Sequence, residues 1–293
     1  MKTPSVGFVG FGEAAYLISE GLKHEGVYNI YAFDANRQHP SLGEVIQERA
    51  SKLDISLVDS LQELCKKSDF IFCATSAKVA LSIANDIVNY LTSQHIYIDI
   101  NATSPMVKED IANVIKNVGA KFVDAAVMES VPLRKHQVPM FISGTGSKNF
   151  EHFASKFGMN VTYISEKAGS SSAIKMFRSI FMKGLSILLL ETIQSSSKYG
   201  VSDIVIESLD NSITKKPLEE TANLLLNRTA IHAERRVYEM NEVISTLEML
   251  DVDFTLSAAV KAKLQSLVDL NVKDLLNNTA PDHYSKLIEI MKN

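Results

Sequence analysis

The sequence predicts an α/β domain built on a doubly wound, largely parallel sheet, followed by an all-helical domain. Up to about residue 165, short apolar runs alternate with longer stretches of helical periodicity, which is the pattern of βαβ units. From Gly169 to Asn293 the helical periodicity continues without a convincing strand. The 293 residues are 46% hydrophobic and 22% charged, which is typical of a globular protein and excludes a disordered or disulfide-rich chain.

The strand candidates are mostly continuous apolar runs, which favours parallel strands buried on both faces. In chain order they are Ser5–Gly10, Asn29–Asp34, Ile55–Val58, Phe70–Thr75, His95–Ile100, Lys121–Val127, Pro139–Ser143 and Val161–Ile164. Helical stretches between them include Ala14–Lys23, Val79–Leu91, Met106–Val118 and Phe150–Phe157. The glycine-containing segment Gly144–Lys148 lacks the spacing of a phosphate-binding P-loop, so we expect a turn there.

The second half of the chain predicts six helices. They are Ser171–Tyr199, Ser202–Ser212, Pro217–Asn227, Ala230–Leu250, Phe254–Leu270 and Pro281–Met291. We place the domain boundary so that residues 1–165 form the α/β domain and residues 166–293 the helical domain, with Ser171–Tyr199 connecting them. That helix is apolar nearly all round, so we expect a homodimer formed through the helical domain.

Charge and cysteine content exclude several classes of function. Lys and Arg total 30 and Asp and Glu total 34, giving a formal net charge of −4, and without a basic run the chain is a poor nucleic-acid binder. Cys65 and Cys73 show no metal-ligand spacing, and no other metal-binding cluster is predicted. No signal peptide is evident, and the apolar stretch Ala173–Ile193 contains four charged residues. We expect a cytoplasmic protein without a membrane span.

A glycine-rich turn follows the first predicted strand, with the sequence Gly10–Phe11–Gly12–Glu13–Ala14–Ala15. In this G-x-G-x-x-A pattern the first glycine permits a tight turn, the second lets the backbone approach a pyrophosphate, and the alanine allows close helix packing. Asp34 lies 22 residues after Gly12, where a carboxylate can bind the ribose hydroxyls of a dinucleotide. The pattern predicts a Rossmann-type cofactor site, although the same glycines could be ordinary turn residues.

The acid at the end of the second strand favours NAD over NADP, because it repels a 2′-phosphate. Asn36 and Arg37 lie close behind it and could bind that phosphate instead, so NADP stays possible. We assign the cofactor site to residues of the glycine-rich turn and of the ends of three further strands. They are Gly10, Phe11, Gly12, Glu13, Ala14, Asp34, Thr75, Ser76, Asn101 and Thr103.

Four segments, in order along the chain, resemble the β-hydroxyacid dehydrogenase and 6-phosphogluconate dehydrogenase superfamily. The first is Gly7–Ala15, and the second, Asp99–Pro105, is similar to the family's D-x-S-T-x-x-P segment beside the nicotinamide. The third, Asp124–Ser130, stands where the family has the substrate-binding D-A-P-V-S-G-G. The fourth, Gly169–Lys175 with Ser179, is similar to G-x-G-x-x-x-K-x-x-x-N. The resemblance covers essentially the whole length.

This resemblance implies that Lys175 is the catalytic acid or base and that Asn101 and Thr103 lie beside the cofactor. It implies a substrate site, for which we select Met128, Glu129, Ser130, Arg178 and Ser179. The chain departs from the family where Met128, Glu129 and Ser130 replace small residues and where Ser179 replaces Asn. With these departures the chain resembles a branch of the superfamily that has a phosphogluconate-dehydrogenase-like C-terminal domain.

The residues around Lys175 support proton transfer on their own. Ser171, Lys175 and Ser179 are four residues apart and would share one face of a helix. A lysine serves as a general acid or base when burial and neighbouring cations lower its pKa. The alternative is that Lys175 reaches solvent and its neighbours only solvate a domain hinge. We expect Glu129 to need a cationic partner, either Arg178 or Arg134, if the substrate carries a carboxylate.

The sequence therefore predicts an NAD(P)-dependent oxidoreductase that transfers a hydride between the nicotinamide and a small 3-hydroxy acid or related hydroxy compound. Two alternatives stay open. One is an oxidative decarboxylase of the phosphogluconate type, and the other is a dinucleotide-binding regulatory protein that has lost turnover. The expected partners are a small molecule and a second copy of the chain, without nucleic acid or membrane.

Overall fold

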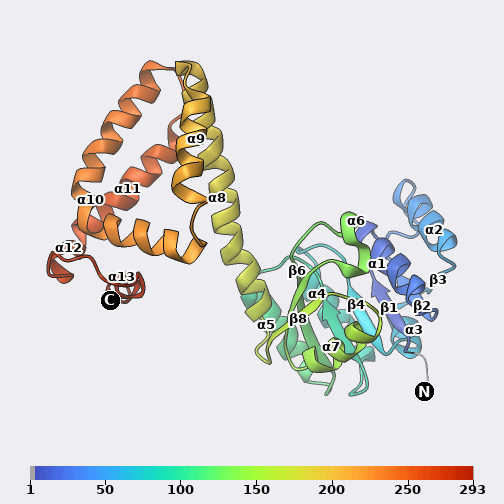
Figure 1. The fold of residues 1–293 in the computed structure, drawn as a ribbon. Coiled ribbons are helices and arrows are strands. Elements are labelled where there is room, and N and C mark those ends of the chain that lie inside the picture. The colour runs from blue at the N-terminus through green and yellow to red at the C-terminus, as the bar shows by residue number, and fades with distance from the viewer. Residues whose placement is uncertain (1–3, 293) are drawn as a thin grey trace. The chain divides into compact units, whose positions relative to one another are not determined.

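The computed structural model describes residues 4–292, and the chain divides into two compact units, Met1–Ser179 and Ile180–Asn293. Unit 1 is built on an eight-stranded sheet with the order β3-β2-β1-β4-β5-β6-β7-β8 (Figure 1). The strands are β1 Val6–Val9, β2 Ile30–Phe33, β3 Ser56–Leu57, β4 Phe70–Cys73, β5 Ile96–Asp99, β6 Lys121–Val127, β7 Met140–Ser143 and β8 Val161–Ser165. The doubly wound α/β fold that the sequence predicts is confirmed.

The sheet is mostly parallel, with one exception. From β3 to β6 each neighbouring pair runs parallel, whereas β7 runs antiparallel to β6 and parallel to β8. The order reverses between β1 and β4, because the chain first adds strands on one side of β1 and then on the other. Ligands of open α/β sheets bind outside the carboxyl ends of the strands at such a reversal.

Helices connect the strands of unit 1 and make up unit 2. In unit 1 they are α1 Glu13–His24, α2 Leu42–Lys52, α3 Leu61–Lys67, α4 Ala80–Ile87, η1 Val88–Tyr90, α5 Pro105–Lys116, α6 Val131–Arg134, η2 Lys135–Gln137 and α7 Ser147–Lys156. The long helix α8, Ser170–Tyr199, begins in unit 1 and ends in unit 2. Unit 2 continues with α9 Ser202–Ile213, α10 Leu218–Met249, α11 Thr255–Asp269, α12 Val272–Leu275 and α13 Ser285–Ile290. The turn expected at Gly144–Lys148 is shorter: residues 144–146 lie between β7 and α7, and Ser147 and Lys148 already belong to α7.

Two apolar clusters cover the two faces of the sheet, because successive strand residues point to opposite sides. On one face the rings of Phe8 and Phe72 stack with centroids 5.1 Å apart, and Phe150 of α7 meets Phe72 edge-on. On the other face Tyr97 stacks on Phe122 with centroids 6.4 Å apart. These clusters hold the strand ends, and the loops that follow them, in fixed positions.

Three helix predictions in unit 2 differ from the structure in their bounds. The two helices expected at Pro217–Asn227 and Ala230–Leu250 are present, but within α10 they meet at a kink at His232, where φ is −112° and ψ is 19°, and not at residues 228 and 229. The residues between the two predicted segments include neither Gly nor Pro, so nothing there stops the helix. The last helix begins at Ser285 instead of Pro281. The Ser285 N–H, which a helix starting at Pro281 would direct to the Pro281 carbonyl, donates to Nδ1 of His283, and that carbonyl accepts from the Asn227 side chain.

Within the part of the chain that the structure describes, no helix has the length and apolar character of a membrane span. The domain boundary expected at residues 165 and 166 stays a prediction. The compact units meet ten residues into α8, between Ser179 and Ile180, so the first turns of this helix, with Lys175, belong to the same unit as the sheet.

Candidate functional site

The residues assigned to the cofactor from the sequence follow the carboxyl ends of four neighbouring parallel strands. Gly10 follows β1, Asp34 follows β2, Thr75 follows β4 and Asn101 follows β5. Carboxyl ends of parallel strands lie at the same edge of a sheet, so these loops are neighbours. The edge includes the β1–β4 reversal, the position where this class of fold binds ligands.

The glycine-rich turn is close against the loop after β4. Gly10 has φ 84°, and a Cβ at this position would lie 2.5 Å from the Ala74 carbonyl oxygen and 2.9 Å from Thr75 Cγ2. Any other residue would therefore be strained and would push the two loops apart. Gly12 differs, because nothing lies within 4 Å of its would-be Cβ. Gly12 precedes α1 without a side-chain cap, so open space lies at a helix N-terminus, which suits a pyrophosphate.

Asp34 is tied to the glycine-rich turn. Its Oδ2 accepts a hydrogen bond of 2.7 Å from the Phe11 backbone N–H, and its Oδ1 accepts one of 2.8 Å from the Asn36 N–H. A carboxylate has about four acceptor positions, so two are left for ribose hydroxyls. The sequence pattern suggested the ribose contact but not this bond, which holds the turn and the end of β2 together.

The loop after β5 presents a buried amide and a buried hydroxyl. Nδ2 of Asn101 donates to Oδ1 of Asp99 over 2.6 Å and to Sγ of Cys73 over 3.3 Å. Oγ1 of Thr103 is buried and has no hydrogen-bond partner among the described residues. A buried hydroxyl without a protein partner can complete its hydrogen bond with a ligand. It suits a site that a polar ligand completes, and the residues at this edge thus fit a dinucleotide.

A fully buried ion cluster lies behind these loops. Nζ of Lys108, on α5, donates to the Asp99 carbonyl oxygen over 2.8 Å and lies 3.4 Å from Asp99 Oδ2 and 3.4 Å from Asp124 Oδ1. All three side chains are completely buried. Burial raises the pKa of the Asp99 carboxyl, and the Lys108 ammonium opposes that rise. Such a cluster is stable only when its charges and polar atoms are paired.

The sequence analysis missed Lys108, although a signal was present. Lys108 shares the buried face of α5 with Ile111 and Ile115, at the helical spacing of three and seven residues. A lysine on an otherwise apolar face must either reach solvent or find a buried anion. Here it finds two anions, which come from β5 and β6.

Asp124 also holds the start of α8. Its Oδ2 accepts from the Ser172 N–H over 3.0 Å, and its Oδ1 accepts from the Ser172 hydroxyl over 2.7 Å. Ser143, at the end of β7, donates to Asp124 Oδ2 and accepts from the Ser171 N–H. A negative side chain is favourable at a helix N-terminus. The carboxylate therefore caps α8 and joins it to the sheet.

Lys175 lies one turn beyond this capped end and is half-buried. The hydroxyl of Ser179 donates to the Lys175 carbonyl oxygen over 2.9 Å, so its proton is engaged with the helix backbone. Ser171 is completely buried, and its hydroxyl has no hydrogen-bond partner among the described residues. Arg178 is exposed. The roles assigned to Lys175, Arg178 and Ser179 from the sequence stay predictions.

The segment after β6, which the sequence analysis assigns to the substrate, is braced by an ion pair. Nε of Arg134 donates to Glu129 Oε2 over 2.8 Å, with both side chains about half exposed. Of the two cations expected to pair with Glu129, the structure selects Arg134. Met128 donates its backbone N–H to the Pro139 carbonyl, and Ser130 precedes α6. The negative charge of Glu129 is thus compensated within its own loop.

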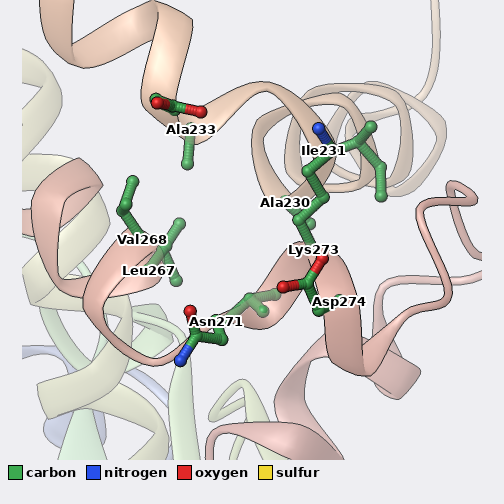
Figure 2. Close-up of a pocket in the computed structure, with 10 residues that line it drawn as sticks. Ala230, Ile231, Ala233, Leu267, Val268, Asn271, Lys273 and Asp274 are labelled. Carbon is green, nitrogen blue, oxygen red and sulfur yellow. The ribbon is translucent and has the colours of Figure 1, made fainter.

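Unit 2 contains a separate pocket of about 180 Å³ beside the bend of α10, shown in Figure 2. Ala230, Ile231 and Ala233 line it from α10, and Leu267 and Asn271 line it from the end of α11 and the residues after it. Close to the bend, Arg236 donates to the Thr229 hydroxyl, and Arg235 pairs with Glu239 on the exposed side of α10. Across residues 4–292 no group of three metal-ligating side chains comes together.

A doubly wound sheet with a glycine-rich turn at its strand reversal and an acid at the end of β2 defines a dinucleotide-binding protein. Residues 5–164 match the model of the NAD binding domain of 6-phosphogluconate dehydrogenase, and the chain belongs to that family. The match assigns an NAD-binding domain to this chain. Residues 197–267 match a domain of unknown function, DUF1932.

Three known proteins show how far the similarity of this chain to others extends. An uncharacterized 28.5 kDa protein of Methanothermus fervidus is 29% identical over 81% of this chain and 88% of its own length. The mitochondrial 3-hydroxyisobutyrate dehydrogenase of Bos taurus is 24% identical over 72% of this chain, and the match spans 62% of that enzyme, less than two thirds of it. An imine reductase variant of Myxococcus stipitatus, solved with NAD+, has a TM-score of 0.77 at 15% identity, covering 99% of this chain and 100% of its own. At that identity the likeness shows the fold alone.

Proposed function

We propose that this chain is an NAD(H)-dependent dehydrogenase or reductase whose substrate is a small 3-hydroxy acid or a related hydroxy compound. NAD supplies the hydride acceptor at the C4 position of its nicotinamide when it is bound. The pyrophosphate would lie at the N-terminus of α1 beside Gly10 and Gly12, the adenosine ribose at Asp34, and the nicotinamide half towards Asn101 and Thr103.

One observation carries the proposal: the strand edge that fits the cofactor and the helix that bears Lys175 are joined by a single buried network. Asn101 donates to Asp99, Asp99 contacts Lys108, Lys108 contacts Asp124, and Asp124 caps α8. A network with both carboxylates paired leaves little freedom to its members. Lys175 therefore lies on a helix whose N-terminus is fixed relative to the loops that would bind the cofactor.

Within this proposal Lys175 moves the proton. In oxidation it accepts the proton of the substrate hydroxyl as the hydride leaves the same carbon, and in reduction it returns that proton. The half-buried position of Lys175, one turn after the capped start of α8, supports this role. Glu129 is already paired with Arg134, which supports a site that still accepts a carboxylate.

The test is a screen with NAD and NADP against short 3-hydroxy acids and the corresponding oxo acids, with absorbance of the reduced nicotinamide and carbon dioxide release measured together. Hydride transfer without carbon dioxide supports the dehydrogenase. Stoichiometric carbon dioxide favours the phosphogluconate-type decarboxylase. Tight NAD binding without turnover on any hydroxy acid contradicts the proposal and favours a regulatory protein.

We further propose that the chain functions as a homodimer, formed through the apolar surface of α8. Three of its exposed apolar residues are Phe177, Ile180 and Leu190, whose exposed fractions are 68%, 73% and 59%. Further exposed apolar residues of α8 are Met176, Phe181, Met182, Ile187, Leu188, Leu189 and Ile193. Apolar surface of this extent on one helix is typical of an interface.

A further inference from the structure

Arg37 occupies the position that decides between the two nicotinamide dinucleotides. Its backbone N–H donates to the Asp34 carbonyl oxygen over 3.1 Å, so the two residues close one turn directly after β2. In dinucleotide-binding folds an arginine near this acid accommodates the 2′-phosphate of NADP. An unengaged Arg37 would therefore attract NADP, against the repulsion from Asp34.

The guanidinium of Arg37 is already engaged by another loop. Its Nη1 donates to Oδ1 of Asp59 over 2.6 Å. Asp59 follows β3, which is the neighbour of β2 at the edge of the sheet and runs parallel to it. The loops after the two strands therefore lie at the same edge, and the anion of one reaches the cation of the other.

Both backbones that carry this ion pair are fixed independently of it. The Asp59 N–H donates to Glu63 Oε2 over 3.1 Å, and the Glu63 N–H donates to the Ser60 hydroxyl over 3.1 Å. Ser60 is the N-cap of α3, and the Glu63 carboxylate reaches back to the residue before it, in a variant of the capping box. Asp59 is thus held at the start of that helix, with its side chain towards Arg37.

On the other side of the pair, α2 holds the Arg37 backbone. Nε2 of Gln47 donates to the Arg37 carbonyl oxygen over 3.2 Å. Gly43 approaches so closely that a Cβ on it would lie 2.4 Å from the same oxygen. A surface ion pair is usually weak because two flexible side chains must be ordered. Here α2 and α3 already fix the backbones of Arg37 and Asp59, so only the two side chains must be ordered.

We propose that Asp59 is a cofactor-specificity residue, which selects NAD(H) over NADP(H) by holding the Arg37 guanidinium away from a 2′-phosphate. Asp59 acts through Arg37 and is a positioning residue that does not itself contact the dinucleotide. The Asp34 carboxylate is then left as the dominant charge beside the ribose. The proposal rests on the assignment of the ribose to Asp34 and is independent of the role of Lys175.

The experiment measures dissociation constants for NADH and NADPH by nucleotide fluorescence, without any substrate. The variants are Asp59→Asn, Arg37→Ala and the double variant. Glu48→Gln is the matched control, because it removes the same charge from an exposed pair with Lys52 on α2. Asp59→Asn is expected to lower the dissociation constant of NADPH about fivefold or more. The reason is that the Arg37 guanidinium, once released from the Asp59 carboxylate, binds the 2′-phosphate. NADH affinity is expected to stay within about twofold, as for Glu48→Gln.

The Arg37→Ala background decides the mechanism. If Arg37 is held by Asp59, Arg37→Ala alone changes NADPH affinity little, and it abolishes the gain that Asp59→Asn produces. A gain that persists in the double variant would show that the charge of Asp59 acts directly, and would overturn the proposal. It is also overturned if Arg37→Ala alone strongly weakens NADPH, since Arg37 would then already bind the phosphate. Equal effects of Asp59→Asn and Glu48→Gln on NADPH likewise contradict it.

Discussion

Nζ of Lys108 lies 3.4 Å from Oδ1 of Asp124, and neither side chain has exposed surface. The two residues come from α5 and β6, and Asp124 in turn caps α8 through Ser172. One buried ammonium faces the two carboxylates of Asp99 and Asp124, and the N-terminus of α8 supplies further positive potential. This cluster makes the position of α8 depend on Lys108, a residue outside the four segments that resemble the family.

Lys108→Met is expected to lower the free energy of unfolding by about 3–5 kcal/mol, because it leaves buried carboxylates without a counter-ion. Urea unfolding at neutral pH measures the loss. Lys116→Met is the control, since Lys116 is exposed on the same helix and its loss should cost less than about 0.5 kcal/mol. Equal stabilities of the two variants would contradict the importance of the buried cluster.

The deficit of Lys108→Met should depend on pH. Burial raises the pKa of Asp99 in the folded state, so above its ordinary value the folded state binds more protons than the unfolded state. The contribution of Asp99 to stability therefore falls as pH rises through the raised folded pKa. Lys108 opposes the raised pKa, so its removal extends this loss to higher pH. The deficit should be smaller at pH 5 than at pH 8, and a deficit of equal size at both contradicts the assignment.

Ser172→Ala tests the cap of α8. The Ser172 hydroxyl donates to a buried carboxylate over 2.7 Å, and its loss should cost about 1.5–3 kcal/mol of unfolding free energy. Ser170→Ala is the matched control, because Ser170 only accepts from the Ser165 hydroxyl and should cost less, about 0.5–1.5 kcal/mol. Denaturant unfolding of both variants makes the comparison, and the reverse order would show that Asp124 does not hold the helix.

The strands could be predicted because a strand of a buried parallel sheet can be recognised from its own local sequence. Each buried strand is an apolar run such as Phe70–Cys73, and the glycine-rich turn follows from the backbone geometry of a single loop. Lys108 could not be placed in the same way. Its partners, Asp99 and Asp124, come from two other elements, and the pairing depends on the order of the strands.

The same reason applies to Asp34 and to α10. The spacing from Gly12 indicated a ribose contact for Asp34, but the bond to the Phe11 N–H depends on how two loops meet. The bend at His232 has no glycine or proline to signal it. Periodicity alone divides α10 at the wrong residues, because a helix that packs on α11, α12 and α13 bends where packing requires.

Asp34→Ser is expected to weaken NADH binding and to narrow or reverse the preference over NADPH. A charge-assisted contact to the ribose contributes about 1.5–3 kcal/mol, and Ser also removes the charge that repels a 2′-phosphate. Fluorescence titration with both nucleotides measures the change. If the wild-type chain prefers NADPH, and Arg37→Ala abolishes that preference, the assignment of Asp34 is wrong.

Leu190→Glu tests the proposed dimer. Leu190 is 59% exposed on α8, and a charge in an apolar interface should raise the dimer dissociation constant by at least about tenfold. Sedimentation or light scattering over a dilution series measures the mass, which for one chain is 32.4 kDa. Asn211→Glu introduces the same side chain at an exposed polar position of α9 and should change nothing. A wild-type chain that is monomeric at every concentration would contradict the proposed dimer.

Lys175→Met should leave NADH binding and the fold intact, while lowering turnover on a confirmed hydroxy-acid substrate by at least about a hundredfold. Methionine preserves most of the volume and removes the group that would exchange a proton with the substrate. Lys183→Met is the matched control, because Lys183 lies two turns further along the same helix and is exposed, so its loss should cost little. NADH titration and unfolding curves show whether either variant is disturbed. If Lys175→Met keeps near-normal turnover while NADH still binds, another group transfers the proton, and the α8 lysine is structural.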